Sequence, residues 1–574
     1  MHDSIEQSTR SAARIGARGK GSGANTLHLA GATLAIVAVI LAWRQRFVCD
    51  DAFITFTYAR NWVEGQGLTW FGARVEGYTS FLWVIWTAIG LRFGVDPVVW
   101  SHAGGLAACA AAVWGTWRLA RVILIDLAPA LAATALVVTN FSFQAFATSG
   151  LETMLQTALL VHATLQALSF RREPSQRDGI VLGALLAAAV FTRPDSALPA
   201  AILALVALHS AFTRRSHRLA SGALGPANAT AARRGIVALI ATAAVPLALW
   251  CGWKLAFYGD ILPNTFHAKT GLERATLGNG LRYVLRFGRA YGLWLPALAI
   301  PFALWRRAWR AETNLLAVMV ATWWAYIILI GGDFMEYRML VPLLPALYIA
   351  LVHAVWSATS PNARRATVVI AIVCAVLAGF SVRHARNFTG VTADRCLDSV
   401  PALANFYDAV PDGDWGRIGR ALAAELTSAD PLIALDAVGA VPWFSRLRTL
   451  DMFGLTDAWV ARNGIPAPAR FPRPGHRRQI PLAELRRRGV HFLIGHPTLV
   501  RRGVIATQPA VAELQEWVRM QLGFGHESTG SVHLVALPVT TDRVLLMWYL
   551  TPTPQLDALI QSRGWETSTI PPAR

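Results

Sequence analysis

The chain has 574 residues, of which 54% are hydrophobic and only 15% are charged, and its formal net charge at pH 7 is +19. A soluble domain is usually about 25% charged, and a single globular core stops growing at roughly 250–300 residues. The apolar surplus therefore excludes an ordinary soluble protein and predicts a polytopic membrane protein. The arginines form short clusters between apolar runs, which is typical of cytoplasmic loops and excludes nucleic acid as the expected partner.

The N-terminal segment, residues 1–25, is basic and rich in Gly, Ser and Ala, and we expect it to be a disordered cytoplasmic tail. The first apolar run, Thr26–Trp43, ends in Arg44 without a small-residue cleavage site. This pattern predicts an uncleaved first transmembrane helix rather than a signal peptide. A basic tail places the N-terminus inside and the following loop outside.

The apolar segment Phe81–Phe93 is too short for a span, which needs about 20 residues, and we predict that it lies in the outer leaflet without crossing. The other predicted spans are residues 98–117, 123–145, 152–170, 179–191, 195–212, 235–257, 288–304, 313–331, 339–357 and 367–383. With this topology the arginine-rich loops lie inside, as the positive-inside rule requires. The sequence therefore predicts about eleven transmembrane helices in the cell inner membrane, with a first outer loop at 44–97.

The composition changes after residue 383, and residues 384–574 are predicted to form an extracytoplasmic mixed α/β domain. Short apolar runs typical of strands occur at Leu432–Leu435, His491–Ile494, Val532–Leu537 and Val544–Tyr549. Helical patterns at Ile418–Leu426 and Ala510–Gln521 alternate with them. The fold class expected is thus a polytopic α-helical membrane protein, 26–383, followed by a soluble α/β domain.

Polar and ionisable residues gather where the predicted helices meet the outer interface. They include Asp50, Asp51, Glu76, Tyr78, Glu152, Arg193, Asp195, His267, Lys269, Asp333 and Arg338. Ionisable groups at membrane depth are costly and usually line a cavity or a functional site. We therefore expect a polar cavity at the outer face, covered by the soluble domain.

The adjacent carboxylates Asp50 and Asp51 have two interpretations. Repulsion between them near lipid would raise one pKa, which suits a general base. Alternatively, they cap the N-terminus of a helix at Ala52–Glu64.

The basic residues His267, Lys269 and Arg338 are positioned to hold a phosphate, Arg338 through a forked contact and Lys269 as a point charge. The alternative is that Lys269 and Arg338 only anchor helix ends at the lipid headgroups. Glu152 also fits a first-turn helix acid, and Arg193 with Asp195 fits a local ion pair around Pro194.

Several short motifs along the chain carry a resemblance to a known family. They are DDAFI at 50–54, YARN at 58–61, EGQGL at 64–68, VEGYTS at 75–80, SGLET at 149–153, RPD at 193–195, GGD at 331–333, DAVG at 436–439 and DMFGLTD at 451–457. In this order they resemble the GT-C superfamily of polyprenyl-phosphate-sugar-dependent glycosyltransferases, and more specifically its terminal arabinofuranosyltransferase branch. The resemblance covers roughly residues 45–460.

The resemblance implies a donor of the decaprenyl-phosphate-arabinofuranose type and a cell-envelope glycan as acceptor. Asp50 or Asp51 would be the base, with Asp50 preferred because it lies nearest the first helix. Donor phosphate and sugar would be bound by Arg338, Lys269, His267, Glu76, Tyr78, Asp195, Arg193, Asp333 and Glu152. No cofactor is certain; a divalent metal is possible if the fold brings Asp50 to Asp333 or Asp260.

Three alternatives stay open at the level of sequence. The first is an enzyme of the same kind that transfers another sugar, such as mannose, or that glycosylates a protein such as pilin. A transporter or flippase of lipid-linked sugars is the rival class, but it would need polar residues at both faces, and no internal repeat supports it. A membrane anchor for a carbohydrate-binding domain would leave the Asp50–Asp51 pair without a purpose.

Overall fold

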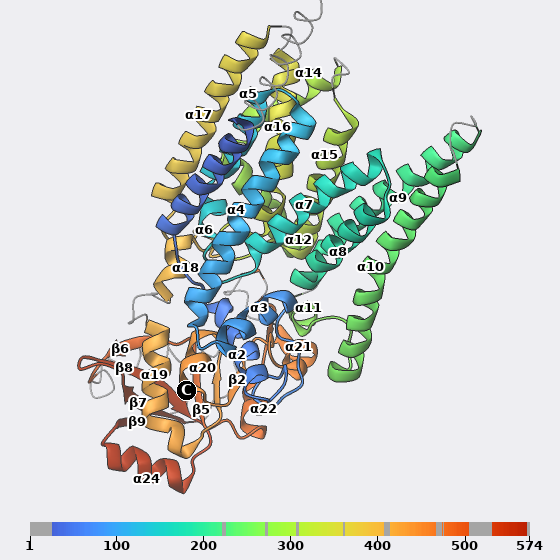
Figure 1. The fold of residues 1–574 in the computed structure, drawn as a ribbon. Helices are drawn as coiled ribbons and strands as arrows, with labels where there is room; N and C mark the ends of the chain where they lie inside the picture. The colour runs from blue at the N-terminus through green and yellow to red at the C-terminus, as the bar shows by residue number, and fades with distance from the viewer. Residues whose placement is uncertain are drawn as a thin grey trace, which may run out of the picture.

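The computed structural model describes residues 26–220, 226–269, 274–305, 309–359, 362–406, 414–466, 473–474, 476–503 and 531–570. Figure 1 shows two stacked parts, a long bundle of helices and a smaller α/β domain at one end of it. The predicted tail, residues 1–25, and the predicted helix at Ala510–Gln521 lie outside the described residues.

Among the described residues, six helices are long and apolar enough to cross a membrane. They are Thr26–Arg44, α4 (Pro97–Leu124), α10 (Pro226–Tyr258), α15 (Ala311–Ile330), Arg338–Thr359, which joins η2 (Arg338–Leu343) to α16 (Leu344–Thr359), and α17 (Ala363–Asn387). A seventh is counted if α12 (Arg274–Ala290) and the following Trp294–Trp305, bent by 93°, form one broken span.

The other predicted spans are also helical, although they are shorter or less apolar. They correspond to α5 (Leu127–Thr139) with α6 (Phe141–Ala145), α7 (Thr153–Arg172), α8 (Gln176–Thr192), and η1 (Pro194–Ser196) with α9 (Ala197–Ala220). Phe81–Arg92 forms a separate 12-residue helix, α3, at the end of the bundle beside the C-terminal domain (Figure 1). The count of eleven spans stays a prediction.

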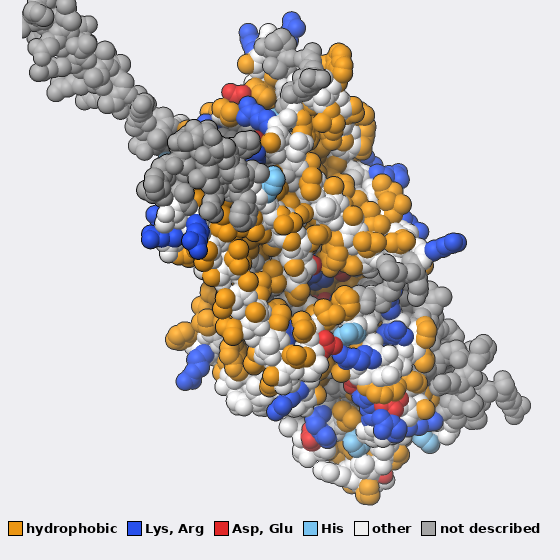
Figure 2. Space-filling view, turned by 90° about the vertical axis from the view of Figure 1, so that its right-hand side faces the viewer, with side chains coloured by type: hydrophobic (Ala, Val, Ile, Leu, Met, Phe, Trp, Pro, Cys, Tyr) orange, Lys and Arg blue, Asp and Glu red, His pale blue; other side chains and the backbone are white. Residues whose placement is uncertain are grey.

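The face of the bundle seen in Figure 2 is largely hydrophobic. Large apolar side chains such as Leu205, Leu249 and Leu298 are 66%, 70% and 72% exposed. Such a surface is stable against lipid, where helices satisfy their own backbone hydrogen bonds. The chain is therefore a multi-pass membrane protein.

Helix α2 (Asp50–Val63) joins the two parts. Its Phe53 and Phe56 rings lie 6.3 and 6.1 Å from the ring of Trp443 in the C-terminal domain. The Arg60 guanidinium donates a hydrogen bond of 2.8 Å to the Trp443 carbonyl and lies over its indole ring. Because almost all of α2 is buried, the first outer loop and the domain pack as one unit.

The C-terminal domain is built on a mixed sheet in the order β2-β1-β5-β8-β7-β9, with β6 also paired to β8. The strands are β1 (Ile433–Leu435), β2 (Thr449–Asp451), β5 (Phe492–Gly495), β6 (Leu499–Arg501), β7 (Val532–Pro538), β8 (Arg543–Tyr549) and β9 (Glu566–Ile570); a small separate sheet pairs β3 (Ile465–Pro466) with β4 (Arg478–Gln479). The helices are α18 (Val400–Phe406), α19 (Asp414–Leu426), α20 (Ala440–Ser445), α21 (Ala458–Asn463), α22 (Leu482–Arg487) and α24 (Pro554–Arg563). All four predicted strand runs and the helix at 418–426 are confirmed.

Strands β1, β2 and β5 are parallel. Residues that follow parallel strands therefore lie at one edge of the sheet. At this edge the β1–α20 loop, which begins at Asp436, reaches the N-terminus of α2. The domain therefore presents this edge to the bundle.

Candidate active site

Two cavities lie where the bundle meets the C-terminal domain. The domain-interface cavity, of about 360 Å³, lies between the start of α2 and the β1–α20 edge, and the bundle cavity, of about 400 Å³, lies among the helix ends. Both are lined by Asp51, Ile54, Lys269 and Leu455, so they meet at these residues. A ligand in one cavity would thus reach a ligand in the other beside Asp51.

Asp51 lies in the first turn of α2, and Cys49, not an aspartate, is the N-cap residue. No side chain caps this helix, so the sequence-based interpretation of the Asp pair as its cap is wrong. The Asp51 carboxylate has no hydrogen bond or ion pair within the part of the chain that the structure describes. Burial raises the pKa of Asp51, and the nearby charges of Lys269 and Arg338 oppose that rise.

Asp50 has a different environment, although it also lines the domain-interface cavity. Its Oδ2 accepts a hydrogen bond of 3.0 Å from the Gly439 N–H, and its Oδ1 accepts one of 2.7 Å from the Ala440 N–H. A Cβ atom at Gly439 would lie 2.0 Å from the Asp50 carbonyl oxygen, so only glycine allows this approach. Burial raises the pKa of Asp50 to about 7 in spite of the two N–H donors. The Asp50 carboxylate thus connects α2 to α20.

Two of the three predicted phosphate ligands lie in the bundle cavity. Arg338, at the start of η2, is buried and paired with Asp333 through an Nη2–Oδ2 distance of 2.7 Å. Lys269, at the end of α11 (Asn264–Lys269), has no ion pair within the described residues. Burial lowers the pKa of Lys269, and the carboxylates of Asp51 and Asp333 counteract this shift.

His267 lies outside both cavities. Its Nε2 lies 2.8 Å from Asp260 Oδ2. Arg462 Nη2, from the C-terminal domain, lies 2.7 Å from the same oxygen. The structure therefore brings Arg338 and Lys269 together and separates His267 from them.

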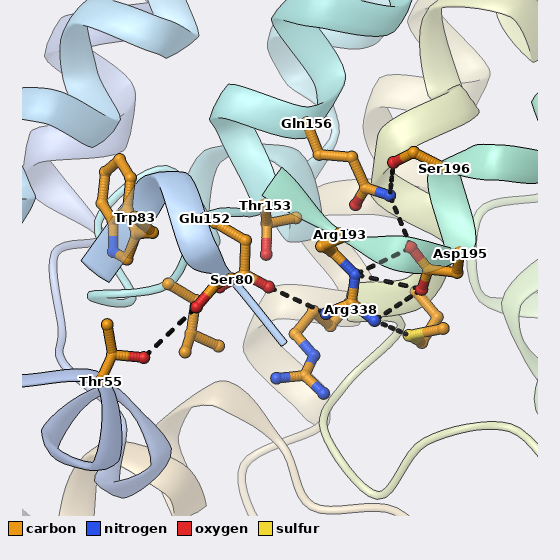
Figure 3. Close-up of polar contacts among 12 residues, drawn as sticks. Thr55, Ser80, Trp83, Glu152, Thr153, Gln156, Arg193, Asp195, Ser196 and Arg338 are labelled. Carbon is orange, nitrogen blue, oxygen red and sulfur yellow. Dashed lines mark hydrogen bonds and ion pairs between the residues drawn. The ribbon is translucent and has the colours of Figure 1, made fainter. Parts of the chain in front are cut away.

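Figure 3 shows the polar network beside Arg338. Arg193 Nη2 lies 2.6 Å from Asp195 Oδ2, which is the local ion pair expected from the sequence, and Arg193 Nη1 also lies 2.9 Å from Glu152 Oε1. Gln156 donates a 3.0 Å hydrogen bond to Asp195 Oδ1. These contacts join the loop before α7 to the start of η1, and together they fix one wall of the bundle cavity.

Glu76 and Tyr78 follow each other closely in sequence but lie in different places. The Glu76 carboxylate is buried against Lys254, with an Oε2–Nζ distance of 2.7 Å, and lines neither cavity. Tyr78 lines the bundle cavity, and its hydroxyl lies 3.2 Å from the hydroxyl of Tyr258. Tyr78 therefore belongs to the lining of the bundle cavity, whereas Glu76 does not.

The domain-interface cavity is also lined by residues that were not among the predicted site residues. Asp436, Arg473, His476 and His496 line it from the domain side. His496 Nδ1 lies 3.2 Å from Asp436 Oδ1. Burial acts to lower the pKa of His496, but the charge and hydrogen bond of the Asp436 carboxylate have the larger combined effect. The pKa of His496 is therefore raised. The DAVG motif drew attention to Asp436, whereas both histidines lie beyond the end of the recognised motifs.

Each of the carboxylates proposed for a metal has other partners. Asp50 is bound to backbone N–H groups, Asp333 to Arg338, and Asp260 to His267 and Arg462. In the described ranges, no group of three or more His, Cys, Asp or Glu side chains has a geometry that could hold a metal ion.

The fold and the two cavities define a class of protein: a multi-pass membrane protein with a charged cavity between its helix ends and a soluble domain. Among known proteins the chain is similar to the terminal β-(1→2)-arabinofuranosyltransferase of Corynebacterium glutamicum, with 28% identity over 402 residues, 61% of this chain and 54% of that protein. It is also 27% identical to the Mycobacterium tuberculosis protein of the same name over 295 residues, 49% of this chain and 44% of that protein. These matches confirm the resemblance given by the motifs, although the chain spans only about half the length of either relative.

Residues 405–537 match a family model described as a domain of unknown function, DUF8728. Among solved structures, ArnT from Cupriavidus metallidurans in the apo state is similar, with a TM-score of 0.48, 16% identity, and coverage of 92% of this chain and 98% of that one. The mycobacterial arabinofuranosyltransferase AftD gives a TM-score of 0.47 at 15% identity, with coverage of 91% of this chain and 40% of that one.

Proposed function

We propose that this chain is a membrane glycosyltransferase that moves D-arabinofuranose from a polyprenyl-phosphate donor to a cell-envelope glycan, on the extracytoplasmic face of the inner membrane. The observation that carries the proposal is Asp51, a carboxylate without an ion pair among the described residues, located where two cavities meet. The names of the two relatives support arabinofuranose as the sugar.

The donor's phosphate and sugar occupy the bundle cavity in this proposal. Lys269 and Arg338 face the phosphate, Lys269 as a point charge and Arg338 through its planar guanidinium. Charge that develops on the departing phosphate is stabilised by such fixed cations in a cavity shielded from water. Apolar lining residues such as Leu262, Phe266 and Ile330 suit the first isoprene units of the lipid.

The acceptor glycan enters the domain-interface cavity, whose lining mixes aromatic and hydrogen-bonding groups, including Trp415, His476 and His496. Asp51 accepts the proton of the acceptor hydroxyl, whose oxygen bonds to the anomeric carbon of the donor. The bond between that carbon and the phosphate oxygen breaks, and the lipid phosphate leaves with the electron pair. A base with a raised pKa suits this step, since general bases work best when their pKa lies near the operating pH.

A transfer assay tests the proposal. The purified protein is incubated with a short-chain polyprenyl-phosphate-arabinofuranose and an arabinan oligosaccharide, and products are identified by mass spectrometry. Wild type should add one pentose, and Asp51→Asn should lower the rate by about 10²–10⁴-fold, the usual contribution of a general base, without changing the melting temperature.

Asp50→Asn is the matched control, because it changes the neighbouring carboxylate in the same way. It should lower the melting temperature, since it weakens the hydrogen bonds from Gly439 and Ala440, and should retain much more activity than Asp51→Asn. Transfer only from a mannose donor would contradict the choice of sugar. Full activity of Asp51→Asn would remove Asp51 from the mechanism.

A further inference from the structure

Helix α12 has three distinct faces. One face is buried against the bundle through Tyr283, Val284 and Phe287. A second face carries Leu277, Leu281 and Leu285, four residues apart and 38%, 47% and 55% exposed. The third face carries the arginines Arg282, Arg286 and Arg289.

A sharp bend in the chain follows α12. The chain turns by 93° after α12 before it continues as the apolar segment Trp294–Trp305. A helix with one apolar and one arginine-rich exposed face usually lies in the membrane interface, with its apolar side among the acyl chains. In that orientation the exposed leucines would lie among the acyl chains, and the arginines of α12 would lie at the level of the lipid headgroups.

Arg286 and Arg289 of α12 meet Arg383 of α17 in a third cavity, of about 580 Å³, which we call the arginine pocket. Its lining includes Arg286, Arg289, Trp294, Phe380, Arg383 and His384, and none of the described residues that line it is an Asp or a Glu. It shares no lining residue with the two cavities of the candidate active site.

The charges in this pocket are only partly neutralised. Arg286 pairs with Asp394, with an Nη2–Oδ2 distance of 2.8 Å, and His384 Nε2 lies 2.8 Å from the buried Glu336. Arg289 and Arg383 are exposed and have no hydrogen bond or ion pair with any residue that the structure describes. Two free guanidinium groups on adjacent helices thus converge on one pocket.

The pocket's place in the bundle makes these arginines unexpected. α17 ends at this pocket and leads into the C-terminal domain, so under the proposed topology the arginines lie on the outer side. The positive-inside rule places such clusters in cytoplasmic loops, not here. Guanidinium groups bind phosphate by paired N–H donors. Trp294 also lines the pocket and is 54% exposed, and tryptophan is a residue type favoured at headgroup depth.

We propose that the arginine pocket binds the phosphate of an anionic phospholipid headgroup in the leaflet next to the C-terminal domain. This lipid is separate from the donor, because the pocket and the bundle cavity are lined by different residues. Its acyl chains would run along the leucine face of α12 and its phosphate would lie between Arg289 and Arg383.

Native mass spectrometry of the full-length protein titrated with phosphatidylglycerol tests this proposal. The variant Arg289→Gln/Arg383→Gln should bind the lipid at least about tenfold more weakly than wild type, since a hydrogen bond to a charged group accounts for roughly that factor. The control Arg282→Gln/Arg386→Gln removes the same charge from the same two helices outside the pocket and should bind as wild type does. Arg289→Lys/Arg383→Lys, which keeps the charge, should give an intermediate affinity.

Three results would overturn the proposal. Equal losses in the pocket and control variants would mean that only net charge matters, and unchanged binding in the pocket variant would remove the site. Displacement of the lipid by millimolar inorganic phosphate, or by a short-chain polyprenyl phosphate at lower concentration than phosphatidylglycerol, would assign the pocket to a different phosphate. Each variant's melting temperature without added lipid shows that a loss of binding is not a loss of folding.

Discussion

At the scale of single residues, the adjacent aspartates Asp50 and Asp51 show how one residue step separates two environments. Successive residues of a helix point about 100° apart, so the two carboxylates of one turn cannot share the same surroundings. Asp50 accepts hydrogen bonds from the backbone of α20, whereas Asp51 faces Lys269 and Arg338. The sequence predicted that the pair is important but favoured Asp50, because Asp50 lies nearest the first helix. The sequence contains no information about where α20 would pack.

Arg338→Lys tests whether Arg338 holds the donor phosphate or only anchors a helix end. Lys keeps the charge and can still pair with Asp333, but it lacks the planar pair of donors. A hydrogen bond between charged groups contributes roughly 1.5–3 kcal/mol, so the rate or donor affinity should fall about ten- to a hundredfold. Initial rates at several donor concentrations measure this, and wild-type kinetics would show that Arg338 is an interfacial anchor.

At the scale of secondary-structure elements, local periodicity predicted most of the structure. The strands at β1, β5, β7 and β8 and the helix α19 were found because their apolar patterns repeat over a few residues. The sharp turn after α12 was missed, since the pattern at 288–304 reads as one continuous apolar span. The contacts of the β1–α20 edge with α2 were also out of reach, because the residues are almost 400 positions apart in sequence.

The pair of His496, after β5, and Asp436, after β1, should make stability depend on pH. The pKa of His496 is raised in the folded protein, so the pair's contribution is complete below about pH 6.5, the value of an unfolded histidine, and is lost as pH rises through the folded value. His496→Gln should therefore lower the melting temperature strongly near pH 6 and little at pH 9. His533→Gln, an exposed histidine of β7 that lies 3.0 Å from Thr569, is the control. A difference between wild type and His496→Gln that is constant from pH 6 to 9 would contradict this account.

At the scale of the whole molecule, composition and charge were sufficient to predict a helical membrane bundle followed by a mixed α/β domain. Composition and charge are sums over many residues, so one misassigned helix or loop does not change the predicted fold class. The number of crossings depends on short helices such as α3, α5 and α8, whose 12, 13 and 17 residues lie at or below the minimum length for a span. The eleven-span topology therefore needs a direct test.

Cysteine labelling in whole cells provides that test. A cysteine at Arg172 or Arg365 should be protected from an impermeant thiol reagent, because both positions lie at helix ends that the topology places inside. A cysteine at Asp430, which is 62% exposed in the C-terminal domain, should be labelled. The native Cys49, Cys109 and Cys396 are buried and should contribute little background. Labelling at Arg172 would mean that an odd number of crossings has been misassigned before it.

The central claim is that the donor phosphate binds at Lys269 and Arg338, with its sugar beside Asp51. A structure of the full-length protein with a non-transferable polyprenyl-phosphate-arabinofuranose analogue measures this directly. The account predicts the phosphate in the bundle cavity within hydrogen-bond reach, about 2.6–3.2 Å, of both cations, and the anomeric carbon facing Asp51. A phosphate bound elsewhere, for example between Arg289 and Arg383, with the bundle cavity empty, would contradict it.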